Sequence, residues 1–274
     1  MLDALHLNPE QEIDRIAAFI AEHVHAAGYE RAVLGISGGV DSALVAALSA
    51  RALGPENVYG MLLPFKTSNP QSVAHGRMVI EQLGIASGLF EITPVVEALV
   101  ARDPAMSGLR KGNIMARCRM ITLYDQSAAW EGLVMATGNR TETLLGYFTL
   151  YGDSAAALRP IAHLYKCQVR ALATHLGLPA EVIAKAPSAD LWAGQTDEDE
   201  LGFTYDEADQ ILYLLTETGL SEDEIAAEGF APATVQAIQR RMASAAFKLL
   251  EPPSLPTGSA TSVAATSVTA PRSG

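Results

Sequence analysis

The sequence predicts an α/β protein in which a parallel β-sheet carries helices on both faces. Short apolar runs alternate along the chain with longer segments of helical periodicity, and polar or glycine-rich turns follow several of the apolar runs. Strands and helices that alternate in this way form βαβ units. The expected sheet is therefore Rossmann-like, and ligands of such sheets bind at the carboxyl ends of the strands.

The size and composition of the chain bound its domain organisation. It has 274 residues, and a hydrophobic content of 49% is ample for a sizeable core. We expect a single domain over residues 1–250. Residues 251–274 are rich in Pro, Ser, Thr and Ala without periodicity, which predicts a disordered tail.

Charge and cysteine content argue against several classes of protein. A net charge of −12 disfavours nucleic acid or an anionic membrane as the main partner. The sequence shows neither a membrane-spanning apolar run nor a signal-peptide pattern, so the expected location is cytoplasmic. Cys118 and Cys167 are too few for a disulfide framework and form no CxxC pair. We interpret both as small buried hydrophobes.

The first half of the chain reads as alternating helices and strands. Asn8 can cap a helix that has Pro9 in its first turn and ends near Gly28. The other expected elements are a strand at residues 33–36, a helix from residue 41, a strand at 57–63, a loop at 64–70, a helix at 71–83, a weaker strand at 89–92 and a short helix at 94–104.

The turn between the first strand and its helix has the composition of a phosphate-binding loop. Its glycines allow the backbone to approach an anion, its serines add hydroxyl donors, and the following helix offers free N–H groups. An acid in such a place makes sense mainly if a divalent metal is bound as well. The loop residues are Ser37, Gly38, Gly39, Val40, Asp41 and Ser42.

The plain structural interpretation of this string is a tight strand-to-helix turn with a capping Asp. The string lacks the Lys of GxxxxGK[ST] and the spacing of GxGxxG, so it matches neither a Walker loop nor a dinucleotide fingerprint. SGGxDS instead resembles the pyrophosphate loop of the ATP pyrophosphatases. That resemblance implies cleavage of ATP between its α and β phosphates and leaves the acceptor unnamed.

The middle of the chain repeats the pattern of a strand followed by a polar turn. A helix at residues 112–130 is expected to carry two of four clustered cations, which serve either charge balance or anion binding. A strand at 132–137 then leads into a turn that ends at Glu142. Glu142 and Asp41 thus both follow strand ends, where they could hold a magnesium ion on nucleotide phosphates. Glu142 as an ordinary first-turn helix residue is the alternative.

The remaining segments add two candidate residues. Asp153, in the polar and aromatic loop 146–154, could be an acid, a base or a ribose ligand. A helix is expected from Arg159, with Lys166 near its start, where a cation opposes the helix dipole and so indicates a bound anion. Residues 186–207 read as a mobile loop or a solvated acidic connector, and helices at 205–218 and 231–250 complete the chain.

With these residues in hand, the chain resembles the ammonia-dependent NAD synthetases. The motifs that carry the resemblance are SGGVDSALVAAL, GNIMARCRM, ATGNRTE, GYFTLYGD, PIAHLYK and PSADLWAGQTDEDELGF. The resemblance implies the adenine nucleotide alpha-hydrolase-like fold. It also implies that ATP and Mg²⁺ adenylate the nicotinate carboxylate of deamido-NAD, pyrophosphate leaves, and ammonia displaces AMP.

The resemblance also assigns roles by position. The loop 37–42 would hold the ATP phosphates, while Asp41 and Glu142 would hold magnesium. Lys166 would stabilise the departing pyrophosphate, and Asp153 is the candidate for steering or deprotonating ammonium. The further implied ligands are Thr137 and Ser188 for ATP and, for the acceptor, Arg117, Arg140 and Lys248. A homodimer is implied, with loops at 66–71 and 188–205 closing over the site.

The chain departs from the family pattern at positions that in the family touch deamido-NAD. Leu150 replaces the usual Lys, Ser154 and Ala155 replace two glycines, Ala157 replaces the usual Asp, and Phe247 replaces the His of a His-Lys pair. One hypothesis is an ordinary NAD synthetase in which Arg159 or Arg140 supplies the missing charge. The alternative is a paralogue that amidates another carboxylate, such as nicotinate mononucleotide.

Hypotheses from other classes find less support in the sequence. A tRNA-modifying pyrophosphatase would be expected to have a basic surface and, commonly, catalytic cysteines. This chain is acidic and has no suitable pair of cysteines. A catalytically dead nucleotide-binding protein conflicts with the intact set of Asp41, Glu142 and Lys166. No built-in glutaminase is visible, so free ammonia is the expected donor, with a separate glutaminase partner left open.

Overall fold

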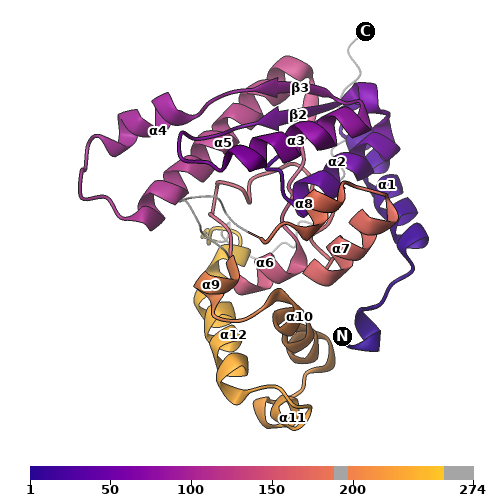
Figure 1. The fold of residues 1–274 in the computed structure, drawn as a ribbon, viewed down its shortest axis with the longest axis vertical. Helices are drawn as coiled ribbons and strands as arrows, with labels where there is room; N and C mark the ends of the chain where they lie inside the picture. Colours follow the sequence, from indigo (N-terminus) through magenta and orange to yellow (C-terminus); the bar gives the residue numbers. More distant parts are fainter. Residues whose placement is uncertain (188–196, 256–274) are drawn as a thin grey trace.

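The computed structural model describes residues 1–187 and 197–255. Its centre is a four-stranded parallel sheet in the order β3-β2-β1-β4 (Figure 1). The strands are β1 (Arg31–Gly35), β2 (Val58–Leu62), β3 (Ala86–Leu89) and β4 (Gly132–Val134). β1 lies in the middle and pairs Ala32 with both Val58 and Leu133. The expected α/β class with a parallel sheet is confirmed.

One face of the sheet is covered by helices from both ends of the domain. They are α1 (Pro9–Ala26), α2 (Val40–Leu53), α3 (Pro70–Leu83), α7 (Lys166–His175) and α8 (Ala180–Ala184). α2 is apolar on nearly every side and is buried from Ser42 to Ser49, because α1 and α7 cover the side that faces away from the sheet. Leu34 of β1 points into this core.

The other face of the sheet is covered by α4 (Thr93–Val100) and α5 (Gly108–Trp130). Val33, the neighbour of Leu34, is fully buried in this second core together with Met61, Phe65 and Met115. Successive residues of β1 therefore enter opposite cores, as the period of two in a strand requires. Helices on both faces are confirmed.

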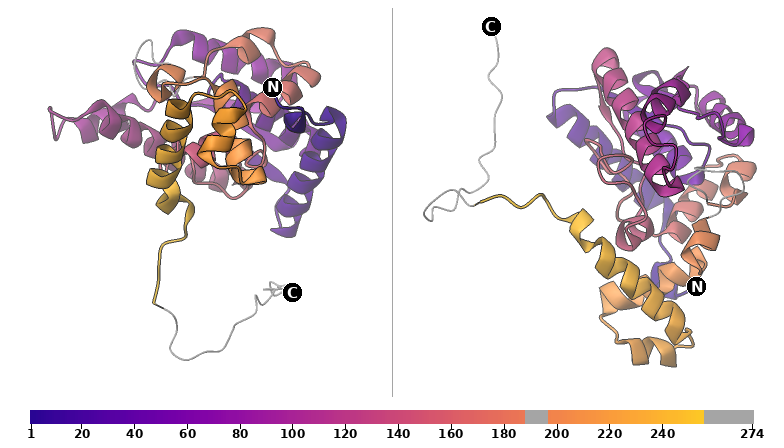
Figure 2. Two further views of the ribbon diagram at one scale, coloured as in Figure 1. Left: turned by 90° about the horizontal axis from the view of Figure 1, so that it is seen from below. Right: turned by 90° about the vertical axis from the view of Figure 1, so that its left-hand side faces the viewer.

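The C-terminal helices gather around a third core. They are α9 (Asp197–Leu201), α10 (Tyr205–Tyr213), the π-helical η3 (Leu214–Thr218), α11 (Glu222–Ala227), α12 (Pro232–Ala245) and the short 3₁₀ helix η4 (Ala246–Leu249). Together with α6 (Arg140–Leu145) they bury Tyr205, Ile211 and Val235. Figures 1 and 2 show α10, α11 and α12 grouped beside the sheet and its covering helices. We call the elements from α9 to η4 the C-terminal helical unit.

Three sequence-based expectations about elements need correction. The third strand occupies 86–89 rather than 89–92, because Ile92 is buried as the residue before α4 and not as part of a strand. No helix begins at Arg159. Residues 160–163 form turns, and α7 begins only at Lys166 after an extended Tyr165. α11 was not expected, although the capping box from Ser221 to Glu224 marks its start.

The expected tail falls largely outside the described part of the chain. Residues 251–255 have no regular structure, and residues 256–274 lie beyond the described ranges. The division into one domain and a tail therefore stays a prediction.

Candidate active site

A cavity of about 850 Å³ opens at the carboxyl ends of the strands. The loop after β1 and the start of α2 form one wall. The ends of β2 and β4, the start of α7 and one side of α5 form others. Part of loop 146–155, residues 185–187 and several residues of the C-terminal helical unit, Lys248 among them, also line the cavity. This is the edge at which parallel α/β sheets bind their ligands. The predicted position of the site is therefore occupied by a cavity of ligand size.

The glycine loop is held by its own hydrogen bonds. The hydroxyls of Ser37 and Ser42 lie 3.0 Å apart, the Gly39 N–H donates to Ser37 Oγ, and Ser42 Oγ donates to the Gly39 carbonyl. Gly38 has a φ of +76°, and a Cβ there would lie 2.1 Å from the backbone carbonyl oxygen of Ser72. Only glycine fits both this conformation and this close approach.

A buried ion cluster lies beside the loop. The Lys166 ammonium approaches Asp41 Oδ2 at 2.5 Å and Glu142 Oε1 at 3.1 Å, and its residue is only 2% exposed. Asn139 caps α6 by accepting from the Glu142 N–H, and its amide donates to Asp41 Oδ1 at 2.8 Å. The two acids that sequence reasoning placed at separate strand ends thus converge on one cation.

Burial and the attraction between opposite charges act against each other at both Glu142 and Lys166, and the pKa of each ends above its ordinary value. Burial is the largest influence on Glu142, and with the nearby Asp41 carboxylate it outweighs Lys166 and raises the pKa of Glu142 to about 7. Burial alone would lower the pKa of Lys166, but the carboxylates of Asp41 and Glu142 raise it above its ordinary value. The lysine therefore stays charged while Glu142 titrates near neutral pH.

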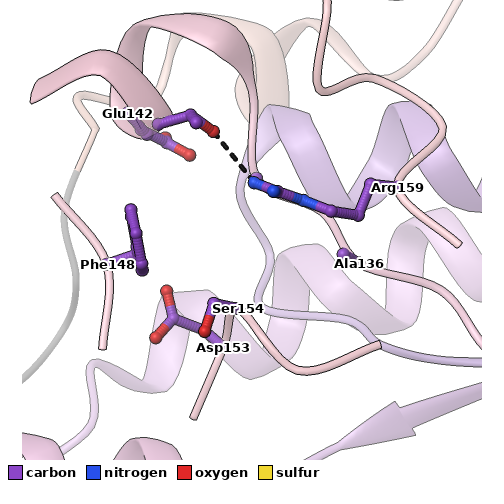
Figure 3. Close-up of a pocket in the computed structure, with 8 residues that line it drawn as sticks. Ala136, Glu142, Phe148, Asp153, Ser154 and Arg159 are labelled. Carbon is purple, nitrogen blue, oxygen red and sulfur yellow. Dashed lines mark hydrogen bonds between the residues drawn. The ribbon is translucent and has the colours of Figure 1, made fainter. Parts of the chain in front are cut away.

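A smaller pocket adjoins the ion cluster and shares Glu142 with the main cavity. Figure 3 shows Phe148, Asp153, Glu142 and Arg159 arranged around it. Asp153 is accessible to solvent and accepts from the Thr149 N–H at 2.8 Å, while desolvation by the surrounding protein raises its pKa. Arg159 reaches toward α6 and donates to Thr143 Oγ1 at 3.0 Å.

Lys248 connects the C-terminal helical unit to this pocket. Its ammonium donates to the carbonyls of Gly146 at 2.7 Å and Phe148 at 2.9 Å and lies over the Phe148 ring. Burial lowers its pKa, and the Asp153 carboxylate opposes that change. In this structure the lysine therefore holds the loop that carries Asp153.

Most of the sequence-predicted ATP residues line the cavity, but two predicted acceptor residues do not. The lining includes the loop residues other than Gly38, together with Thr137, Glu142, Lys166, Asp153 and Lys248. Arg117 is outside the lining and donates to the Leu150 carbonyl. Arg140 pairs with Glu217 and stacks on Tyr165, also away from the cavity. Ser188 and the rest of residues 188–196, the first half of the predicted loop 188–205, lie outside the described residues, whereas the second half includes α9.

Sequence reasoning missed several residues that the fold brings to the site. Lys185 lines the cavity and donates to Ser72 Oγ. Arg119, one of the four clustered cations considered for anion binding but given no specific role, also lines it and donates to the Leu63 carbonyl. Tyr147 donates to Asp197 and Glu200. Asn139 alone had a local signal, since Asn139 and Glu142 have the spacing of a capping box.

A parallel sheet whose carboxyl edge carries this loop, two acids and a buried lysine defines a nucleotide-binding α/β protein of the ATP pyrophosphatase type. The profile of the NAD synthase family matches residues 12–252. The chain is 47% identical over 247 residues to the NH(3)-dependent NAD(+) synthetase of Trichlorobacter lovleyi, covering 90% of each chain. It therefore belongs to the NAD synthase family, whose members are ligases.

Solved structures agree with this assignment. The NH3-dependent NAD synthetase from Campylobacter jejuni is 34% identical with a TM-score of 0.78, over 91% of this chain and 100% of that one. The NMN synthetase from Francisella tularensis is 30% identical with a TM-score of 0.82, over 92% and 100%. Across residues 1–187 and 197–255, no helix combines the length and hydropathy that crossing a bilayer requires.

Proposed function

We propose that this chain is an ammonia-dependent ligase that uses ATP to convert deamido-NAD into NAD, AMP and pyrophosphate. The observation that carries the proposal is the identity of 47% with an NH(3)-dependent NAD(+) synthetase over 90% of both chains. It is supported by the convergence of Asp41, Glu142 and Lys166 beside the glycine loop.

In the first step the nicotinate carboxylate attacks the α-phosphorus of ATP. The bond between that phosphorus and the oxygen that bridges the α and β phosphates breaks, and pyrophosphate leaves with the bonding electrons. The loop 37–42 holds the phosphates through backbone N–H groups and hydroxyls, and Thr137 and Ser188 are further ATP contacts. The charged Lys166 stabilises the negative charge that the departing pyrophosphate acquires. The pKa of Lys166, raised by its two carboxylate partners, keeps this cation available at any physiological pH.

Asp41 and Glu142 fit the requirements of a magnesium site on nucleotide phosphates. They supply hard oxygen donors that face one cation, and Mg²⁺ is commonly held by one or two carboxylates plus phosphates. Among the described residues no group of three His, Cys, Asp or Glu side chains forms a self-sufficient metal site. The ion would neutralise phosphate charge, and it would need the nucleotide to complete its coordination.

In the second step ammonia attacks the carbonyl carbon of the adenylate and AMP leaves with the bonding electron pair. The attacking nitrogen must lose a proton, and Asp153 is the candidate acceptor. Its raised pKa brings the carboxylate closer to the range where a general base works well. Lys248, and with it Arg117 and Arg140, are the proposed acceptor-side cations, of which only Lys248 lines the cavity.

A homodimer is part of the proposal. It is supported by the exposed apolar side chains Leu109, Ile121 and Tyr124 along α5. Sedimentation equilibrium should give twice the chain mass of 29.0 kDa, and a monomer at micromolar concentration would contradict it.

Free ammonia is the proposed nitrogen donor and the cytoplasm is the proposed location. The proposal includes no nucleic-acid or membrane partner.

The test of the proposed reaction is direct. Protein with ATP, Mg²⁺, ammonium and deamido-NAD should yield AMP, pyrophosphate and NAD in equal amounts, and Asp41→Asn should abolish turnover. Parallel reactions with nicotinate mononucleotide address the altered positions Leu150, Ala157 and Phe247. The absence of AMP and NAD above background, or a kcat/KM at least tenfold higher with nicotinate mononucleotide, would overturn the proposal.

A further inference from the structure

Asp209 is a carboxylate buried in the C-terminal helical unit, away from the cavity lining. It belongs to α10 and is 0% exposed, with the apolar residues Ala208, Ile211 and Leu212 packed in the same core. Burial raises its pKa, which hydrogen bonds from its neighbours partly offset. Because a buried carboxylate is costly unless its oxygens are paired, the contacts of Asp209 identify its role.

Each oxygen of Asp209 accepts a hydrogen bond from a different helix start. Oδ1 accepts from Thr141 Oγ1 at 2.5 Å, and Oδ2 accepts from the Cys167 N–H at 2.7 Å. Thr141 is the second residue of α6, and Cys167 is the second residue of α7. Thr141 Oγ1 in turn accepts from the Lys166 N–H at 3.0 Å, so the two helix starts are also joined directly.

These contacts lie next to the two residues that converge on the cavity. Thr141 immediately precedes Glu142, and Cys167 immediately follows Lys166. The side chains of Glu142 and Lys166 meet at 3.1 Å. The backbone that bears them is therefore fixed from behind by one carboxylate. The N–H of Cys167 is among the first four of α7, which have no partner within the helix and need an acceptor from outside.

We infer that Asp209 is a positioning residue for the ligase reaction, holding Glu142 and Lys166 in their working arrangement through Thr141 and the Cys167 N–H. The inference rests on the proposed function. Asp209 does not line the cavity, so its effect would pass through the starts of α6 and α7. Errors of about 1 Å in a catalytic group can lower turnover by two orders of magnitude, so loss of this support should reduce kcat.

The test uses the full chain and two independent ways of removing the same support. Asp209→Asn keeps the shape but replaces one acceptor oxygen with a donor, and Thr141→Val deletes the relaying hydroxyl at constant volume. Both should lower kcat 10- to 100-fold while the KM for ATP changes less than threefold. Thr141→Ser restores the hydroxyl and should recover at least half of wild-type kcat. The double variant should be no worse than the poorer single variant.

Asp206→Asn is the matched control, because Asp206 lies on the same helix and pairs with Arg170 at the surface. It should leave kcat unchanged. Variants that lose thermal stability but keep kcat within twofold of wild type would overturn the inference. If Asp209→Asn does not fold, the comparison of Thr141→Val with Thr141→Ser decides, and equal kcat values for those two would overturn it.

AMP release is followed with both deamido-NAD and nicotinate mononucleotide. A wrong acceptor then shows in the wild-type protein, which would release AMP only with nicotinate mononucleotide. A wrong role for Asp209 shows only in the variants, measured with whichever acceptor the wild type uses. The two failures are therefore distinguishable.

Discussion

Glu142 is the member of the buried ion cluster whose charge depends on pH near neutrality. Its contact with Lys166 is longer than that of Asp41, at 3.1 Å against 2.5 Å. Burial and the neighbouring Asp41 raise its pKa from 4.5 to about 7. The folded protein therefore holds a proton on Glu142 between these two pH values, whereas the unfolded chain releases it.

This linkage predicts how stability changes with pH. A raised pKa in the folded state contributes stability that is complete below about pH 4.5 and is lost as pH rises through about 7. Glu142→Gln removes the dependence. At pH 8 the variant should therefore have a free energy of unfolding about 1–3 kcal/mol greater than that of wild type, and it should unfold at a higher urea concentration. At pH 4.5 the advantage should vanish.

Urea titrations at pH 4.5, 6 and 8 measure this difference. Glu10→Gln, at an exposed position near the start of α1, is the control that should follow wild type. Turnover by Glu142→Gln should be lost at every pH if Glu142 has its proposed role, because a neutral amide is a poor replacement for a carboxylate that binds magnesium. A variant that is less stable than wild type at pH 8 would contradict the pKa argument.

Gly38 yields a second prediction at the scale of single residues. Gly38→Ala adds a methyl group to a positive φ and forces it against the Ser72 carbonyl. We expect a loss of more than about 2 kcal/mol and at least a tenfold rise in the KM for ATP. Gly177→Ala is the control, since Gly177 has a φ of +66° but no atom within 4 Å of the added Cβ.

Gly177→Ala should show only the smaller cost of backbone strain, about 1 kcal/mol, and an unchanged KM. Urea unfolding and initial rates at varied ATP measure both quantities. Equal destabilisation by the two substitutions would show that the contact with Ser72 adds nothing.

The residues that sequence could identify are those whose local pattern carries their chemistry. The glycine loop and Asp41 follow β1, and Glu142 follows β4 after a short turn, so their convergence follows from the rule that parallel strands share a carboxyl edge. Asp209, by contrast, contacts Thr141 across 68 residues and Cys167 across 42. No local pattern encodes such a pairing, which depends on how α10 docks against α6 and α7.

Elements were predictable where periodicity was strong and capping was clear. α1 has its Asn cap and first-turn proline, and the central strands are buried apolar runs. The expected helix from Arg159 rests on Leu164, Leu172 and Leu176 at helical spacing. Leu172 lies in α7 and Leu176 caps its end, whereas Leu164 is buried in the irregular segment before the helix. Tertiary burial there imitates the pattern of a helix face.

η4 is the element whose position bears on the proposed acceptor side of the site. It is one turn long, and its Lys248 holds the carbonyls of Gly146 and Phe148. Lys248→Met keeps the length of the side chain but removes the donor. We expect the KM for the acceptor to rise about tenfold, because a charge-assisted hydrogen bond is lost. The KM for ATP should stay within twofold.

Steady-state kinetics with each substrate varied in turn measure this separation. Arg51→Met on the outer side of α2 is the control for a surface cation and should change neither constant. A parallel rise in both KM values would mean that Lys248 supports the whole cavity rather than the acceptor loop.

For the whole molecule, the described cores account for folding without the last part of the chain. The buried residues of the three clusters end at Ile238, and the last buried hydrophobic residue in the described part of the chain is Ala245. A chain that stops after Leu255 should therefore keep its melting temperature within about 2 °C, less than the shift expected from a loss of 1 kcal/mol, and keep its kcat. Calorimetry and rate measurements on both lengths test this, and a lower melting temperature would place residues 256–274 in the folded structure.

The bridge from Asp209 to α6 and α7 has a consequence for the order in which the protein is made. Every strand of the sheet precedes residue 135, whereas Asp209 is translated some seventy residues later. Because chains begin to fold from the N-terminus during synthesis, the sheet and glycine loop can form on the ribosome before the support for Lys166 exists. A product that ends before Asp209 would therefore carry the glycine loop, Asp41, Glu142 and Lys166 without the carboxylate that joins the starts of α6 and α7.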